Sequence, residues 1–431
     1  MAKVEERRFE EYVERLEGVV GHADRHGPLR AYLSGLLLPG ERKSVEPMAA
    51  RIEPRRVRAR HQSMHHFVAT APWEERDLLR VSRDYALEQL ERHGPVQAWV
   101  VDDTGIPKKG IHSVGVARQY CGQLGKQDNC QVVVTVSLVN TTMSVPAAYH
   151  LYLPESWAKD RARRRGAGVP ENLTFRTKWE IALEEIDRLP AEGLPPAPVV
   201  ADAGYGVATE LRDELRRRGL SYAVGISRDV TVWAPGTGPS APKTRSKLGR
   251  PPKLLRRDGE HKPLSVLRLA QQLSSRAWKE VRWREGTKGA MRSRFARIRV
   301  RAAHRDYWRT EPRPEEWLVI EWPKGEKEPT KYWLSSVPET ASVQELIALI
   351  KIRWRIERDY QEMKQELGLD HFEGRGWLGF HHHGVLCIAA YAYLAAERAR
   401  LSPPAPLTFL RAAPLPKGFR PRGATATNGA A

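Results

Sequence analysis

The sequence has 431 residues, with 71 Lys and Arg against 52 Asp and Glu, so the formal net charge is +19. A chain of this length fits two or three domains, and its apolar runs are too short to span a bilayer. The first residues lack the apolar stretch of a secretory signal, so we expect a cytoplasmic protein without a membrane partner. The three cysteines fit neither a disulfide framework nor a paired zinc site. The excess of basic residues predicts that the protein binds a polyanion.

Residues 1–95 are predicted to form a helical N-terminal domain. Apolar residues recur at helical spacing over Phe9–Val20, Leu29–Leu38 and Glu74–Arg92. Within this region the segment Glu53–Gln62 is strongly cationic. It is either a helix that rests on a DNA backbone or an ordinary basic helix of a packing module, and the two interpretations stay open.

Residues 96–226 change to a pattern of strands and helices. An apolar run, Gln97–Val101, leads to Asp102, and a second one leads to Asp202. Between and after them we expect strands at Gln131–Asn140, Ala147–Leu153 and Tyr222–Ile226 and helices at Lys178–Leu189 and Thr209–Arg218. Early strands followed by alternating helix and strand are typical of a mixed α/β sheet of ribonuclease-H type, so this segment is predicted to be the first part of such a domain.

Residues 227–340 are predicted to be a β-rich insertion. A loop is expected at Pro235–Lys253, followed by strands at Phe295–Ala302, Trp317–Trp322 and Tyr332–Ser335. The insertion holds seven of the thirteen tryptophans, which are expected to fill its core.

Residues 341–401 are predicted to return to the α/β domain, with one long helix from Val343 to about Leu367 and another over Phe380–Leu401. Residues 402–431 are rich in Pro, Gly and small residues, and a disordered tail is expected there.

Three acids stand out in this pattern: Asp102 and Asp202 at two predicted strand ends, and Glu357 in the long helix. Carboxylates that converge from such elements hold divalent metal ions against a phosphodiester. Asp103 is the alternative to Asp102, because neighbouring side chains on a strand point to opposite faces. Taken singly, Glu357 fits an i,i+4 ion pair with Arg353, and Asp202 fits a helix cap.

These acids lie in motifs that resemble those of the DDE transposases of bacterial insertion sequences. Asp102 and Thr104 match the first motif, and Asp202, Gly204 and Tyr205 match the second. The third motif of the resembling subgroup, Tyr-x2-Arg-x3-Glu-x6-Lys, is met by Arg353, Glu357 and Lys364, with Ile350 at the Tyr position.

The resemblance implies a DNA transposase of ribonuclease-H-like fold that binds the ends of its element, cleaves them and joins them to target DNA. It implies two Mg²⁺ ions, with Mn²⁺ as a substitute, held by Asp102, Asp202 and Glu357. It also implies double-stranded DNA as partner, a second copy of the protein in the DNA complex, and association with the bacterial nucleoid. The predicted DNA contacts are Arg353, Lys364, Lys108, Lys109, Tyr205 and Arg250, the last in a segment that resembles half of an AT-hook.

Two further readings of the sequence remain. A catalytically inactive, domesticated relative would bind DNA as a repressor or architectural factor, and Ile350 leaves room for it. A stand-alone metal-dependent nuclease would cleave without joining. The consecutive residues His381, His382 and His383 suggest a metal site, but neighbours on a helix point about 100° apart, so we expect them to contact substrate or lie on the surface.

Overall fold

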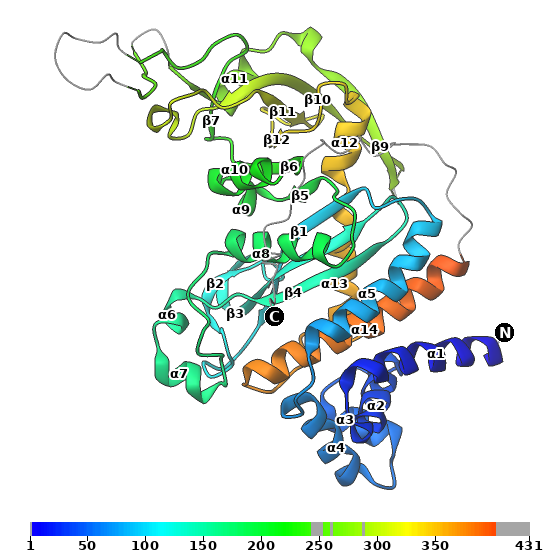
Figure 1. Cartoon of the computed structure of the whole chain (residues 1–431). Helices are drawn as coiled ribbons and strands as arrows, with labels where there is room; N and C mark the ends of the chain where they lie inside the picture. The colour runs from blue at the N-terminus through cyan, green and yellow to red at the C-terminus, as the bar shows by residue number, and fades with distance from the viewer. Residues whose placement is uncertain (1, 243–252, 259–261, 287–288, 402–431) are drawn as a thin grey trace, which may run out of the picture. The chain divides into compact units, whose positions relative to one another are not determined.

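The computed structural model describes residues 2–242, 253–258, 262–286 and 289–401, which form two compact units (Figure 1). Of these residues, unit 1 contains 2–195 and 353–401, and unit 2 contains 196–352. These are units of packing. The functional division into domains at 95, 226, 340 and 401 stays a prediction.

Unit 1 begins with helices, as predicted. Helices α1 to α4 pack against one another. Helix α1 also contacts α5 and α14 (Trp377–Leu401) through the stacked or tilted rings of Tyr12, Tyr85 and Tyr393, whose centroids lie 4.5–6.3 Å apart. The helices are α1 (Ala2–Val20), η1 (Ala23–Arg25), α2 (His26–Leu37), α3 (Val45–Ile52), α4 (Val57–Ala69) and α5 (Glu75–Arg92). The cationic segment predicted at Glu53–Gln62 therefore forms the turn between α3 and α4 and the start of α4.

The sheet of unit 1 is antiparallel, and β3 lies between β1 and β4. Every residue of β4 is buried, as is β3 from Cys130 to Val139, which requires cover on both faces of the sheet. The strands predicted at Gln131–Asn140 and Ala147–Leu153 correspond to β3 and β4, which pair antiparallel. The strands are β1 (Ala98–Pro107), β2 (Ala117–Cys121), β3 (Lys126–Val139) and β4 (Ser144–Leu151).

Helices cover this sheet. Helix α8 starts with a capping box in which the Thr177 side chain accepts from the Glu180 backbone and Glu180 accepts from the Thr177 backbone. Helix α14 runs along α5, and both contact β4 (Figure 1). The remaining helices of unit 1 are α6 (Glu155–Ala158), α7 (Arg161–Gly166), α8 (Lys178–Ala191), α13 (Trp354–Gln365) and α14 (Trp377–Leu401).

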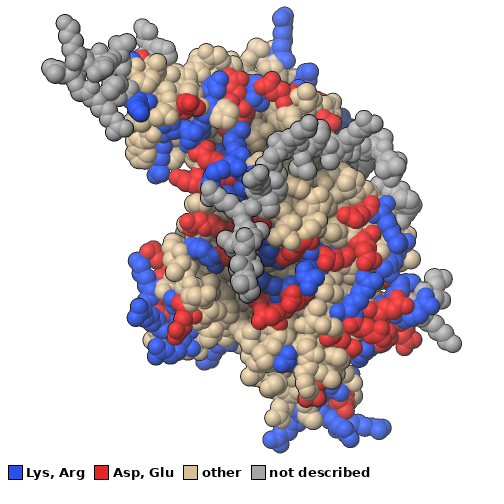
Figure 2. All heavy atoms as spheres, in the orientation of Figure 1, with Lys and Arg blue, Asp and Glu red and all other residues tan. Residues whose placement is uncertain are grey.

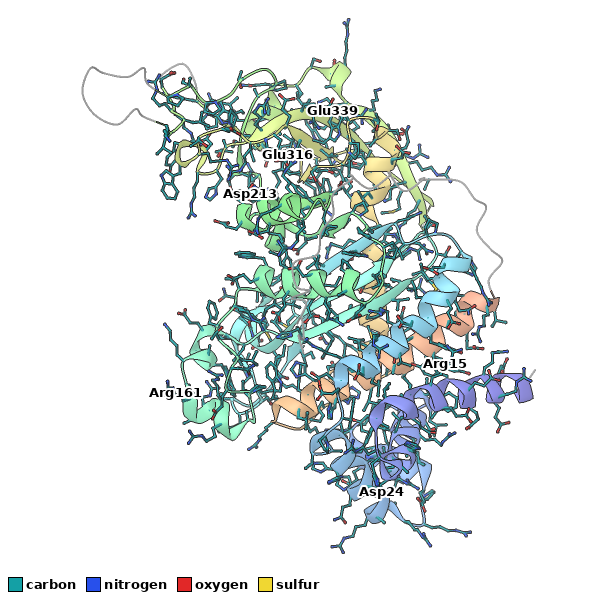
Figure 3. The ribbon with its side chains drawn as sticks, in the orientation of Figure 1. Arg15, Asp24, Arg161, Asp213, Glu316 and Glu339 are labelled. Atoms are coloured by element: carbon teal, nitrogen blue, oxygen red, sulfur yellow. The ribbon has the colours of Figure 1, made fainter. Side chains whose placement is uncertain are left out.

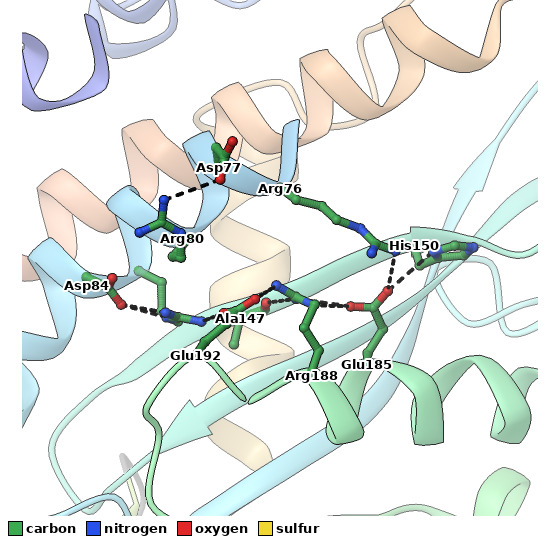
Figure 4. A network of polar contacts seen from close by, with 10 residues as sticks. Arg76, Asp77, Arg80, Asp84, Ala147, His150, Glu185, Arg188 and Glu192 are labelled. Atoms are coloured by element: carbon green, nitrogen blue, oxygen red, sulfur yellow. Dashed lines mark hydrogen bonds and ion pairs between the residues drawn. The ribbon is translucent and has the colours of Figure 1, made fainter. Parts of the chain in front are cut away.

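A chain of charged side chains ties α5, β4 and α8 together (Figure 4). The carboxylate of the buried Glu185 lies 3.0 Å from a guanidinium nitrogen of Arg188. It lies 3.4 Å from side-chain nitrogens of both Arg76 and His150. Burial acts to raise the pKa of Glu185, but the hydrogen bond from His150 and the charge of Arg188 outweigh it and lower that pKa to about 2. The carboxylate therefore stays ionised inside the fold and holds three elements in place.

Unit 2 contains a mixed sheet in the order β5-β6-β12-β11-β10-β7-β8, with β9 paired to β10. The β5–β6 pair is parallel and the other pairs are antiparallel. Its strands are β5 (Val199–Ala201), β6 (Tyr222–Ile226), β7 (Thr231–Trp233), β8 (Leu264–Ser265), β9 (Lys279–Gly286), β10 (Gly289–Ala302), β11 (Glu316–Trp322) and β12 (Lys331–Ser335). Its helices are α9 (Ala203–Gly206), α10 (Thr209–Arg217), α11 (Val266–Gln271), η2 (Ser275–Ala277), η3 (Asp306–Trp308) and α12 (Val343–Lys351).

The chain is thus a mixed α/β protein with a helical N-terminal region, as the sequence predicted. Inside unit 2, the acid Glu316 of β11 accepts a hydrogen bond of 2.7 Å from the Tyr222 hydroxyl and pairs with Arg216. The position of Glu316 is labelled in Figure 3. Among the residues that the structure describes, we find no helix that combines the length and apolar character needed to cross a membrane.

Two predictions about these elements are wrong. The long helix expected from Val343 to Leu367 is two helices, because the chain tightens at Ile352, whose N–H bonds to the Leu349 carbonyl three residues back. The tryptophans of the insertion are not all core: Trp233 is buried, but the side chain of Trp308 lies 61 % exposed on η3.

Candidate active site

Asp102 lies in the middle of a strand. The sequence predicted a strand end at this residue, which is wrong, because β1 continues to Pro107 alongside the long strand β3. Asp102 is opposite Thr135, whose hydroxyl donates to the Asp102 carbonyl at 3.0 Å. The Asp102 Oδ1 atom accepts the Asp103 backbone N–H at 2.9 Å. The carboxylate is therefore held by the middle of a paired strand and not by a loop.

Glu357 lies in the first turn of α13 and shares one partner with Asp102. Arg353 Nη1 is 2.7 Å from Asp102 Oδ2, and Arg353 Nη2 is 2.6 Å from Glu357 Oε1. The i,i+4 ion pair that the sequence allowed on this helix is thus present. The same guanidinium also brings together two acids that are far apart in the chain.

Asp103 points to a different element. Its carboxylate pairs with Lys178 at the start of α8, whereas that of Asp102 pairs with Arg353. This is the alternation expected of neighbouring residues on a strand. Of the two candidates, Asp102 is the one that shares a partner with Glu357.

Lys364 and Lys108 are bound inside unit 1. Lys364 Nζ donates to the Gly105 carbonyl of β1 at 2.7 Å, and Lys108 Nζ donates to the Phe372 carbonyl at 2.7 Å. Burial lowers the pKa of both amines, and nearby acids, Asp370 first, oppose the shift. Lys364 thereby attaches the helix of Glu357 to the strand of Asp102. Contact of either lysine with DNA stays a prediction.

Asp202 belongs to unit 2, between β5 and the short helix α9. Its Oδ1 accepts the backbone N–H groups of Gly204 at 2.9 Å and Tyr205 at 3.4 Å, so the helix-cap interpretation of this residue holds. Gly206 is required by the close approach of the backbone to β6, because a Cβ there would lie 1.9 Å from the Gly225 carbonyl oxygen. The backbone at Asp202 is thus held by β5 on one side and by the start of α9 on the other.

The remaining predicted residues are dispersed. Lys109 is exposed, Tyr205 is buried, and Ile350 is buried in α12. Arg250, in the segment that resembles half of an AT-hook, lies outside the described residues.

The three consecutive histidines are buried in α14, so the prediction of substrate contact or surface is wrong. The imidazole of His382 lies between the Val68 and Trp73 carbonyls, at 3.0 and 2.9 Å, and stacks on the Trp73 ring. His383 meets the Tyr32 hydroxyl at 2.8 Å and the Gly368 carbonyl at 2.9 Å. Burial, as the main cause, lowers the pKa of His381 to about 3 and those of His382 and His383 to about 4. These side chains hold α14 to its neighbours.

Two residues near the acids were missed. Lys178 pairs with Asp103, and the buried Tyr360 lies one turn after Glu357, next to Thr135 of β3. The helical pattern of α13 could have identified Tyr360 as an inward residue. Nothing in the sequence connects Lys178 with β1.

The acids of unit 1 suit a hard divalent cation. Asp102 and Glu357 provide carboxylate oxygens from a strand and the adjoining helix, the ligand type that Mg²⁺ and Mn²⁺ take. Across the described residues, no group of three or more His, Cys, Asp or Glu is arranged to hold a metal ion. In the conformation described, the charge that lies against both acids is the guanidinium of Arg353.

Comparison with known proteins identifies the class. The model of the DDE superfamily endonucleases matches residues 15–290, which include Asp102 and Asp202 and end before Glu357. The chain belongs to this family, so the family expected from the motifs is confirmed. Family membership also implies dependence on a divalent metal.

A curated relative from Microchaete diplosiphon is named a probable transposase for insertion sequence element IS701. It is 36% identical to this chain over 169 residues. The match covers 38% of this chain and 40% of that protein, so it spans less than half of either.

Proposed function

We propose that this protein is a DNA transposase that binds the ends of its insertion sequence, cleaves them and joins the 3′-hydroxyl ends to target DNA. The observation that carries the proposal is the shared contact of Asp102 and Glu357 with Arg353. Folding has brought two motif acids together on a strand and a helix. Membership of an endonuclease family and the similarity to a probable transposase support the same conclusion.

In this proposal Asp102, Asp202 and Glu357 hold two Mg²⁺ ions, for which Mn²⁺ can substitute. Such ions activate the nucleophile and stabilise the leaving oxygen in phosphodiester chemistry. Asp202 joins the set on the evidence of its motif. Arg353 lies against the other two carboxylates, and the Lys364 contact to Gly105 joins their helix to their strand.

DNA is the proposed partner, and a second copy of the protein is proposed because two element ends must be held together. The start of α4 suits a DNA backbone: Arg55, Arg56 and Arg58 are exposed, and the stretch from Pro54 to Trp73 contains no acid. Arginine at the start of a helix opposes the helix dipole, and phosphates would relieve this repulsion. Basic side chains also gather over α7, where Arg161 points outward (Figures 2 and 3).

The test is strand cleavage of a duplex that carries the element ends, in Mg²⁺. Glu357→Gln and Asp202→Asn each lower the cleavage rate by about a thousandfold or more, since each removes a ligand that stabilises charge in the transition state. Glu362→Gln is the matched control, because Glu362 lies on the same helix and pairs with Arg398.

Each outcome has a distinct meaning. Cleavage that survives either substitution would remove the proposed site. End binding by the wild type without cleavage would favour the inactive DNA-binding relative. Cleavage without strand joining would favour a stand-alone nuclease.

A further inference from the structure

Arg353 holds the two acids of unit 1 with one planar cation. Its two terminal nitrogens contact different carboxylates, at 2.7 Å from Asp102 and 2.6 Å from Glu357. The side chains are 16 % exposed for Asp102, 28 % for Arg353 and 54 % for Glu357. The cluster is therefore reachable from solvent on its Glu357 side.

The guanidinium and a divalent ion need the same oxygens. A Mg²⁺ ion binds carboxylate oxygen at about 2.0–2.1 Å, closer than the guanidinium nitrogens lie. An ion that takes both Asp102 Oδ2 and Glu357 Oε1 would have to fill the space that the Arg353 nitrogens occupy. The two cations therefore compete for the pair.

The position of Arg353 allows it to leave. It is the residue before α13, at the break that follows α12, and its side chain makes no helix-cap hydrogen bond. The Glu357 carboxylate is 54 % exposed, so water can solvate it when the guanidinium moves away. A DNA phosphate offers the same guanidinium an equivalent two-pronged partner.

We propose that Arg353 is an internal counter-ion that occupies the acid pair in the absence of DNA and is exchanged for a divalent cation when a phosphate draws it away. Arg353 thus acts as a positioning residue that couples DNA binding to metal binding. The inference rests on the proposed function in taking Asp102 and Glu357 as metal ligands. By linkage, DNA then raises the affinity of the pair for metal, and metal raises the affinity for DNA by the same factor.

The first experiment measures binding of Mn²⁺ alone to the full chain without DNA, by electron paramagnetic resonance of the free ion. Arg353→Met binds Mn²⁺ about tenfold more tightly than the wild type, the modest factor expected when a partly exposed ion-paired competitor is removed. Arg353→Lys gives an intermediate affinity, because an ammonium cannot bridge two carboxylates as a guanidinium does. Adding Asp102→Asn to Arg353→Met abolishes the gain.

Arg358→Met is the matched control. Arg358 follows Glu357 on α13 and is exposed, so its removal takes the same charge from the same helix. It leaves the Mn²⁺ affinity close to that of the wild type. An equal gain in Arg358→Met would mean a general charge effect and would overturn the proposal, as would an unchanged or weaker affinity in Arg353→Met.

The second experiment tests the coupling by Fe²⁺-dependent cleavage of the polypeptide, which reports a bound ion near β1 and α13. A short DNA duplex increases this cleavage in the wild type and in Arg358→Met, but has little effect in Arg353→Met, where the pair is already open to the ion. Equal stimulation in all three proteins contradicts the coupling. Neither experiment requires DNA cleavage. A protein that exchanges Arg353 for a metal ion but does not transpose DNA can therefore be distinguished from one that transposes DNA without this exchange.

Discussion

Two clusters in unit 1 contain side chains of the types that bind metal ions, but they differ in their exposure to solvent and in their partners. Asp102 and Glu357 are distant in sequence, yet they meet on one arginine and stay partly exposed. His381, His382 and His383 are consecutive, yet they are buried in separate directions, and their ring nitrogens face backbone groups. Adjacency in the chain therefore does not make a site. What distinguishes the two clusters is whether the folded chain already satisfies the side chains with its own backbone.

The contrast between the two clusters requires that the buried histidines stabilise the fold, and the largest expected effect tests this requirement. His382→Ala removes a buried ring that stacks on Trp73 and lies between the Val68 and Trp73 carbonyls, to one of which the neutral ring donates its N–H. The expected loss in free energy of unfolding is about 3 kcal/mol, measured by urea denaturation. His65→Ala, on the exposed face of α4, is the control and changes stability by less than about 0.5 kcal/mol. A mild effect of His382→Ala would reopen a functional role for the triplet.

The stability of the fold should also depend on pH, because the folded protein keeps the three imidazoles neutral. Their pKa values in the folded state, about 3 for His381 and about 4 for the other two, lie below the ordinary value of 6.5. Between these values the unfolded chain binds more protons, so the stabilisation is complete above pH 6.5 and is lost as the pH falls. Each histidine contributes a slope of about 1.4 kcal/mol per pH unit in that window.

The measurement is the urea midpoint at several pH values from neutral to about 4.5. In His381→Gln the dependence of the midpoint on pH is smaller, because one of the three buried imidazoles is gone. A slope in His381→Gln equal to that of the wild type would contradict the burial of His381 as a neutral group.

The smallest expected effect concerns how the acid pair is aligned. Lys364→Met removes the hydrogen bond to the Gly105 carbonyl, at a cost of about 1 kcal/mol in stability, and loosens α13 on β1. We expect the DNA cleavage rate to fall about tenfold while the affinity for DNA and its salt dependence stay unchanged. If Lys364 instead contacts a phosphate, the affinity falls and the salt slope drops by about one. Lys109→Met, an exposed lysine near the end of β1, provides the comparison.

Much of the fold follows from local signals. The capping boxes at Thr177 and Ser342 mark where α8 and α12 begin, and the β-branched run from Gln131 identifies β3. The spacing of Arg353, Glu357 and Lys364 on one helix face is also a local property, and both cations do contact the strand of Asp102. These features depend on residues within a few turns of one another, so the sequence carries them.

Other features depend on partners that only the folded chain brings together. The continuation of β1 past Asp102 follows from the length of β3, and the burial of the histidines follows from α14 packing on the N-terminal helices. Gly206 is explained by β6, a strand that follows it in the chain. The sequence by itself thus determined the element types, the family motifs and the basic excess, because these arise from short-range spacing and composition. Which acids share a counter-ion and which polar groups are buried was decided by tertiary structure, since both depend on long-range packing that desolvates one side chain and leaves another in reach of water.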